Sequence, residues 1–321
     1  MKNKYCFTAV MLLTVALCAY LFTNIYVKNE AKTENNSFTV VTSFYPMYIA
    51  TANIVGNCED ITVQNLSEPQ TGCLHDFQMT PEDMKLLSTA DVFVINGGGM
   101  ESFLEDVIAQ YPELIIVETI ETEDVHEHSE EEEHMHEEEA SHEEHEHIHD
   151  HANAHAWMSV LHYREQVEYI ANALCEAMPE SAGKLRENAR VYDTKLAELQ
   201  AQQQEILQIA AGNKIVSFHE AYEYLAEDYG LEICYTLNLD EERQVSAGEV
   251  ADVLEIINES DVEIIFAEEL YGSELSDTIQ NEADVTVCYL DTLVRGEYDL
   301  DSYIHGMQEN INILKQAFGV K

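Results

Sequence analysis

From Phe38 onward, short hydrophobic runs alternate with amphipathic stretches along the chain. In the first part, four short runs have the length and composition of buried strands, and stretches with helical spacing lie between them. The predicted strands and helices, in chain order, are Thr39–Thr42, Ile49–Val55, Ile61–Leu66, Pro81–Thr89, Val92–Ile95, Phe103–Ala109 and Leu114–Val117. Thr80 suits an N-cap, because Pro81 and two acidic residues follow it. The pattern predicts a parallel sheet covered by helices.

The same alternation resumes after Lys214. The predicted elements there are Ile215–Phe218, Tyr222–Tyr229, Ile233–Leu237, Val250–Ile257, Ile264–Ala267, Leu275–Ile279, Val285–Leu290 and a last helix, Ile304–Phe318. Between the two parts, a helical pattern broken at Pro179 extends to Gly212. We therefore predict an α/β protein of two lobes, each a mostly parallel sheet with flanking helices, joined by a long connector helix.

Composition divides the chain further. Residues 121–151 are mostly Glu and His with almost no apolar residues, a composition that cannot supply a core, so we expect a mobile loop inserted in a folded protein. The predicted organisation is a signal or anchor segment with its linker, an N-terminal lobe that contains this loop, a connector helix and a C-terminal lobe. Their bounds are 1–37, 38–158, 159–211 and 212–321.

The first residues indicate export from the cytoplasm. Two lysines precede a stretch without charge from Tyr5 to Val27. This stretch is longer than the hydrophobic part of most cleaved signals and approaches the length that spans a bilayer. The leader is cleaved, retained as an anchor, or lipidated at Cys18, although Leu17 is bulky for a lipoprotein site. We expect a protein tethered to the outer side of a bacterial membrane, or a periplasmic one if the leader is cleaved.

Charge and cysteine usage exclude several classes of partner and site. The formal net charge is −47, with 15 basic and 62 acidic residues, so the surface repels phosphate backbones and nucleic acid is excluded as a partner. The exported part carries five cysteines without a C-x-x-C pair, which indicates neither a thiolate zinc site nor a disulfide framework. Attraction of cations needs sharper evidence than charge alone.

The fourteen histidines fall into two groups. Nine lie in the Glu/His-rich loop and form a candidate accessory metal region: His126, His128, His134, His136, His142, His145, His147, His149 and His151. Others are judged by position, because ligands of open α/β sheets bind beyond the carboxyl ends of the strands. His219 and Asp291 directly follow predicted strands, His75 lies in the loop after a strand, and His155 lies where the chain returns from the acidic loop.

Three imidazoles and one carboxylate match Zn²⁺ better than Ca²⁺ or Mg²⁺, which prefer oxygen ligands. His162 and His305 lie inside predicted helices and are interpreted as surface residues. Trp157 either covers the site or packs under the connector helix. Glu268, near a strand end, is either a hydrogen-bond acceptor for a ligating histidine or a solvated carboxylate.

At these residues the sequence resembles the zinc-binding members of the metal-specific solute-binding protein family that feeds ABC transporters. The matching segments are His75 to Asp83, Asn153 to Met158, Ser217 to Leu225 and Leu290 to Leu293. Leu74 and Ala154 depart from the family pattern, which usually has proline at both positions.

The resemblance implies zinc ligands at His75, His155 and His219, with Asp291 or a water as the fourth. Zinc is implied because manganese members carry Glu where this chain has His219. It further implies capture of Zn²⁺ between two lobes and its delivery to a membrane permease. We expect the chain to be a monomer.

Three alternatives are weighed against this interpretation. A zinc hydrolase is disfavoured because Glu223 stands where an H-E-x-x-H motif starting at His219 needs its second histidine. Gly97, Gly98 and Gly99 lack the Lys-Ser/Thr of a phosphate-binding loop, so we interpret them as a strand-to-helix turn. A manganese or iron carrier of the same family, and a tethered metal-buffering adhesin, stay open.

Overall fold

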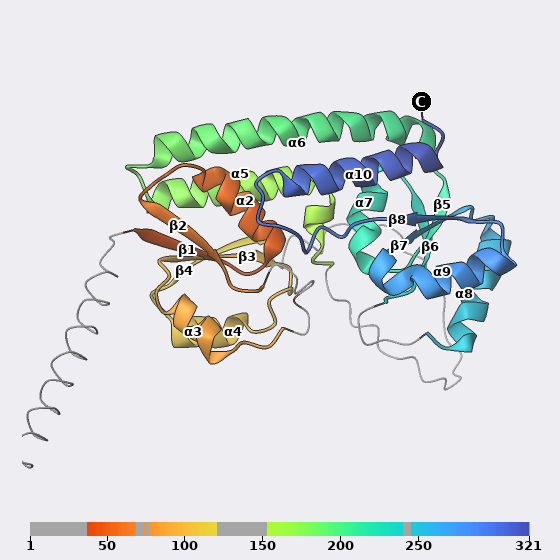
Figure 1. Cartoon of the computed structure of the whole chain (residues 1–321), viewed down its shortest axis with the longest axis horizontal. Coiled ribbons are helices and arrows are strands. Elements are labelled where there is room, and N and C mark those ends of the chain that lie inside the picture. The colour runs from red at the N-terminus through yellow and green to blue at the C-terminus, as the bar shows by residue number, and fades with distance from the viewer. Residues whose placement is uncertain (1–36, 69–73, 75–76, 121–152, 240–244, 321) are drawn as a thin grey trace, which may run out of the picture. The chain divides into compact units, whose positions relative to one another are not determined.

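The computed structural model describes residues 37–68, 74, 77–120, 153–239 and 245–320. They contain two four-stranded sheets with the orders β2-β1-β3-β4 and β6-β5-β7-β8 (Figure 1). The strands are β1 (Phe38–Thr42), β2 (Ile61–Asn65), β3 (Val92–Gly97), β4 (Ile115–Ile120), β5 (Lys214–Ser217), β6 (Glu232–Thr236), β7 (Ile264–Ala267) and β8 (Thr286–Tyr289). Both sheets are parallel, and each strand overlaps a predicted one. The predicted fold class is confirmed.

Helices of the first half follow the predicted order, with one displaced start. They are α2 (Tyr45–Val55), α3 (Pro81–Leu87) and α4 (Leu104–Gln110). The α2 helix begins at Tyr45, four residues before the predicted Ile49. The sequence pattern missed its first turn because Tyr45, Pro46 and Met47 are all buried and show no polar face. The predicted N-cap of α3 is confirmed, since Thr80 and Asp83 form a reciprocal capping box.

The predicted break at Pro179 separates α5 (Val160–Ala177) from the connector helix α6 (Ala182–Ala210). The helical elements around and after them are η2 (Ala156–Met158), η3 (Glu220–Tyr222), α7 (Glu223–Asp228), α8 (Ala247–Ser260), α9 (Glu269–Glu282) and α10 (Ser302–Ala317). The α6 helix packs against α2 and α5 of the first half and against α10 of the second (Figure 1). One helix thus covers parts of both halves.

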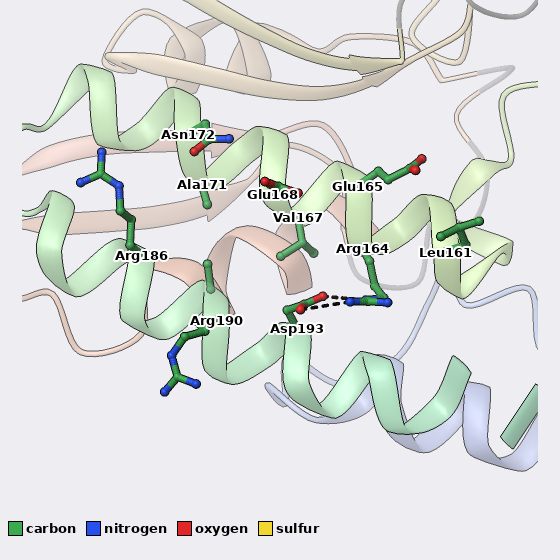
Figure 2. A pocket seen from close by; sticks show the side chains of 11 residues that line it. Leu161, Arg164, Glu165, Val167, Glu168, Ala171, Asn172, Arg186, Arg190 and Asp193 are labelled. Atoms are coloured by element: carbon green, nitrogen blue, oxygen red, sulfur yellow. Dashed lines mark hydrogen bonds and ion pairs between the residues drawn. The ribbon is translucent and has the colours of Figure 1, made fainter. Parts of the chain in front are cut away.

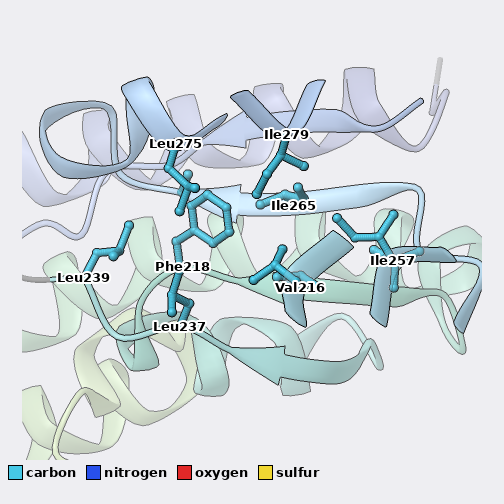
Figure 3. Close-up of a cluster of buried hydrophobic side chains, with 11 residues drawn as sticks. Val216, Phe218, Leu237, Leu239, Ile257, Ile265, Leu275 and Ile279 are labelled. Carbon is cyan, nitrogen blue, oxygen red and sulfur yellow. The ribbon is translucent and has the colours of Figure 1, made fainter. Parts of the chain in front are cut away.

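The second sheet has a hydrophobic core on its inner strands (Figure 3). Val216 lies on β5, Phe218 directly follows this strand, and Ile265 lies on the neighbouring β7. They pack with Ile257 of α8 and Ile279 of α9. Every residue of β7 is buried, as expected for a central parallel strand covered on both faces.

The first sheet leaves a turn at the carboxyl end of β3. Gly97, Gly98 and Gly99 all have positive φ, and a Cβ on Gly97 would lie 2.3 Å from the Ile120 carbonyl oxygen. This geometry excludes other residues at Gly97. The three glycines therefore form a strand-to-helix turn, as predicted. No helix in the described part of the chain is both long and apolar enough to cross a bilayer.

Candidate metal centre

His155 is fully buried just before η2, and the carboxamide of Asn153 fixes its ring. The Asn153 Oδ1 atom lies 2.9 Å from His155 N and 2.9 Å from His155 Nδ1. Because the backbone N–H can only donate, Oδ1 is the acceptor, and the Nδ1–H of a neutral His155 donates to it. That tautomer places the ring lone pair on Nε2, the atom through which a histidine held in this way ligates a metal.

The other side of the Asn153 carboxamide reaches the second half of the chain. Its Nδ2 donates to the Glu220 carbonyl at 2.9 Å and to Glu223 Oε2 at 2.7 Å. Two acceptors face the Asn153 Nδ2 and two donors face its Oδ1, so only one orientation of the amide satisfies all four groups. The Tyr224 hydroxyl also donates to the Asn153 carbonyl, at 3.0 Å. One residue therefore orients His155 and bonds the segment that follows His219.

His219 is half-buried two residues beyond β5 and caps η3. Its Nδ1 accepts the Ala221 N–H at 2.9 Å, and Ser217 Oγ–H donates to its carbonyl at 2.7 Å. A neutral imidazole that accepts at Nδ1 carries its proton on Nε2. Binding a cation at His219 therefore requires this ring to give up its contact with Ala221.

The two rings are spaced as ligands of one ion. Their centroids lie 5.4 Å apart with an interplanar angle of 87°. Two imidazoles that bind one tetrahedral zinc at about 2.0–2.1 Å place their ring centres about 5 Å apart. The structure thus brings together His155 and His219, which are 64 positions apart in sequence.

His75 and the accessory histidines, residues 126 to 151, lie outside the described residues. Among the residues that are described, no group of three or more His, Cys, Asp or Glu side chains is placed to hold a metal ion.

Asp291 follows β8 and is exposed, and its carboxylate lines a recess of about 850 Å³ with Glu268, Arg295 and Asn310. Packing around the carboxylate raises the pKa of Asp291, and the Leu293 N–H and the Arg295 guanidinium oppose this shift. Leu293 N–H donates to Oδ1 at 2.8 Å.

The segment that carries Asp291 is tied to both histidine segments through its neighbours. Tyr222, three residues after His219, donates its hydroxyl to the Leu290 carbonyl at 2.7 Å. Trp157, two residues after His155, donates Nε1–H to the Thr292 carbonyl at 2.9 Å. The backbone on either side of Asp291 is therefore fixed relative to both rings.

The structure clarifies the residues whose roles were left open. Trp157 is fully buried and lies beside His155, with ring centroids 5.0 Å apart. Glu268 forms an ion pair with Arg295 at 3.8 Å rather than standing as a solvated carboxylate. His305 is exposed on α10, as predicted, whereas His162 is half-buried on α5, with its Nδ1 3.1 Å from Glu165 Oε2.

A second recess, of about 420 Å³, lies between α5 and α6 (Figure 2). Arg164 and Asp193 form a paired ion contact across it, with Arg164 Nε 2.6 Å from Asp193 Oδ1. None of the predicted metal ligands lines this recess. It is a groove between two helices and not part of the histidine site.

Sequence patterns had assigned no role to Asn153. Its hydrogen-bond partners Glu220 and Glu223 are 67 and 70 positions away, so their contact is a tertiary one that local periodicity does not contain. The available signals were its place two residues before His155 and its position at the start of the family-matching segment Asn153 to Met158.

Comparison with known proteins covers nearly the whole chain. The family model described as zinc-uptake complex component A, periplasmic, matches residues 40–317. The high-affinity zinc uptake system protein ZnuA of Bacillus subtilis is 30% identical over 319 residues, which cover 98% of this chain and 96% of that protein.

Solved structures show the same architecture. Zn(II)-bound AdcA from Streptococcus pneumoniae has a TM-score of 0.69 and 25% identity, over 88% of this chain and 58% of that one. The SBP FpvC from P. aeruginosa, in complex with Ni²⁺, has a TM-score of 0.71 and 25% identity, over 88% of this chain and 97% of that one.

Proposed function

Because the chain belongs to the family of zinc-uptake complex component A proteins, we propose that it is the solute-binding subunit of a bacterial zinc importer. It captures Zn²⁺ outside the cytoplasm and delivers it to a membrane permease. Binding, transfer and release move the ion without making or breaking a covalent bond, so the chain acts as a carrier and not as an enzyme.

The observation that carries this proposal is the pair formed by His155 and His219. Two imidazoles whose ring centroids lie 5.4 Å apart suit borderline-soft zinc. Asn153 holds the His155 ring in the tautomer that has its lone pair on Nε2. A ligand that is already oriented loses less conformational entropy when it binds the ion.

The full ligand set that we propose is His75, His155 and His219, with Asp291 or a water molecule as the fourth ligand. His75 enters from the family resemblance. Asp291 enters because its flanking carbonyls are bonded to Tyr222 and Trp157, which follow the two histidines. A site of three histidines and one oxygen ligand is one that zinc accepts in tetrahedral geometry.

Metal competition on the exported chain tests this function. Purified protein is titrated with zinc against a chromogenic chelator, and the titration is repeated with excess manganese. We expect one tight zinc ion per chain that manganese does not displace. Tight manganese binding would instead favour the manganese carrier, and several weak, equivalent sites would favour a metal-buffering adhesin.

We propose that the Glu/His-rich loop, residues 121–151, is a weak accessory store beside the tight site. Flexible ligands must be ordered on binding, at about 1–2 kcal/mol per backbone residue fixed, so they bind less tightly than preorganised ones. Replacing the loop with a short Gly/Ser linker should leave one tight ion and remove weaker ones in calorimetric titration. Loss of the tight ion with the loop would refute the histidine site as primary, and an unchanged stoichiometry would refute the store.

The attachment and organisation of the chain are also proposals. We propose that it is tethered to the membrane through its leader segment, residues 1–37, and that it acts as a monomer. The division into lobes 38–158 and 212–321 with a connector 159–211 stays a prediction. Sedimentation of the exported chain, and mass analysis of its first residues, test these points.

A further inference from the structure

A buried carboxylate lies in the first half, next to the glycine turn after β3. Glu101 is 5% exposed. Its Oε1 accepts the Ser43 hydroxyl at 2.7 Å and the Asn96 N–H at 2.9 Å, while its Oε2 accepts the Gly97 N–H at 3.0 Å. Because Ser43 follows β1 and Asn96 and Gly97 end β3, Glu101 joins the carboxyl ends of two adjacent parallel strands, the edge at which such sheets bind ligands.

One route leads from Glu101 to His155 through Asn96. The Asn96 Nδ2 donates to the Ala154 carbonyl at 2.8 Å, and its Oδ1 accepts from Gln166 at 2.9 Å. The turn itself also touches this segment, since a Cβ on Gly98 would lie 3.3 Å from the Cα of Ala154. The residue just before His155 therefore rests on the turn that Glu101 holds.

A second route uses ring contacts. Phe44, the neighbour of Ser43, meets Trp157 edge to face with centroids 5.0 Å apart. Trp157 lies against the His155 ring at the same centroid separation, 5.0 Å. Displacing Ser43 would therefore disturb the packing of His155 from its other side.

We propose that Glu101 is a positioning residue for metal capture, because its carboxylate sets the turn and the ring stack that hold His155. This inference rests on the proposed function. In the described part of the chain, the Glu101 carboxylate bonds to Ser43, Asn96 and Gly97 and not to His155, His219 or Asp291. It acts through Asn96, Ala154, Ser43 and Phe44.

The charge state of Glu101 matters for this role. The Ser43 hydroxyl and the N–H groups of Asn96 and Gly97 all donate to this side chain, which suits a carboxylate. A protonated oxygen would instead direct its O–H toward a backbone N–H that can only donate. Burial raises the pKa of Glu101 to about 7, and the bonds from Ser43, Asn96 and Gly97 oppose that rise. The proton therefore binds near neutral pH. It removes the cost of burying the charge, but it also takes away one of the acceptor positions that hold the turn.

Among the described residues, two other titratable groups face the same turn. Glu118 of β4 lies beside Gly97, because a Cβ on Gly97 would come within 2.9 Å of Glu118 Oε1. His155 approaches from the segment that the turn supports. A pH measurement must therefore separate Glu101 from both.

The test measures zinc affinity by chelator competition between pH 6 and 8, on the exported wild-type chain and on Glu101→Gln. We expect the variant to bind about tenfold or more weakly at pH 8, the size typical of groups that orient a ligand. Its log Kd should also change less steeply with pH than that of the wild type. Glu105→Gln, an exposed acid of the same lobe, and Glu118→Gln are matched controls that should keep the wild-type slope.

A Glu101→Gln chain with lower thermal stability but wild-type Kd and slope would show a structural role alone and overturn the inference. Loss of slope in Glu118→Gln instead would also overturn it. If Glu101→Gln does not fold, Ser43→Ala removes one donor, which should move the midpoint of the pH profile upward, and an unmoved midpoint refutes the role. A wild-type chain without a tight zinc site would refute the proposed function itself.

Discussion

His155 and His219 are neighbours in space, but hydrogen bonds of opposite sense hold their rings. His155 donates from Nδ1 to Asn153 and is fully buried, whereas His219 accepts at Nδ1 from Ala221 and is half-buried. The first ring is ready to bind a cation through Nε2, and the second must first break a contact. From this difference we predict that His155 binds the ion first and that His219 joins it second.

The largest effect should come from removing either ring. His155→Ala and His219→Ala should each weaken zinc binding by about 100-fold or more, because each removes an imidazole that we propose as a zinc ligand. Stopped-flow competition should show slower association for His155→Ala and mainly faster release for His219→Ala. His305→Ala, on the exposed face of α10, is the control. If both variants changed the association and release rate constants equally, the proposed order of binding would be wrong.

The next effect compares a buried acid of the first half, Glu101, with a half-buried acid of the second half, Asp228. Burial raises the pKa of Glu101 from 4.5 to about 7 and that of Asp228 from 3.8 to about 6. Both folded-state values lie above the unfolded ones, so the stability linked to each proton is present below the unfolded pKa and is lost as pH rises. For Glu101 the loss is on the order of 3 kcal/mol between pH 4.5 and 7.

Urea unfolding of the metal-free chain at several pH values measures this loss. Relative to Glu101→Gln, the wild type should lose stability up to about pH 7, and relative to Asp228→Asn only up to about pH 6. A difference between wild type and variant that does not vary with pH would refute the assignment.

A smaller effect on zinc affinity separates the two functions of Asn153, which are to orient His155 and to bond Glu220 and Glu223. Asn153→Ala should weaken zinc binding about 10- to 100-fold, because it removes the acceptor that orients His155. Asn153→Asp keeps that acceptor but places a carboxylate against the Glu220 carbonyl and Glu223. It should therefore retain more affinity than Asn153→Ala while destabilising the contact between the halves. Identical affinities for both variants would show that orienting His155 contributes nothing.

The smallest expected effect is that of Glu223→Gln. Its amide oxygen can still accept from Asn153 Nδ2, so the zinc Kd should change by no more than about threefold. Glu223→Ala removes the acceptor and provides the comparison. A large loss for Glu223→Gln would mean that the negative charge, rather than the hydrogen bond, supports Asn153.

The fold was largely predictable, because strands buried on both faces read as continuous apolar runs. Helix starts were less so: α2 begins at Tyr45, where Tyr45, Pro46 and Met47 are all buried and give no amphipathic signal. His219 could be placed from the end of a predicted strand, and His155 from the return of the chain after the acidic loop. The roles of Asn153 and Glu101 could not be predicted, because each depends on partners that are distant in sequence. Nothing in the local sequence distinguishes buried Glu101 from an exposed acid.

The connector helix α6 also constrains how the chain reaches its native state. Asn188 of α6 donates to the carbonyls of Ile54 and Val55, at 3.0 and 3.1 Å, across more than 130 positions. The first half therefore cannot finish its helical cover until α6 has been synthesised. Such distant contacts cost loop-closure entropy before they stabilise anything, so they slow folding. The half that carries His155 is made first but completed late, together with the half that carries His219.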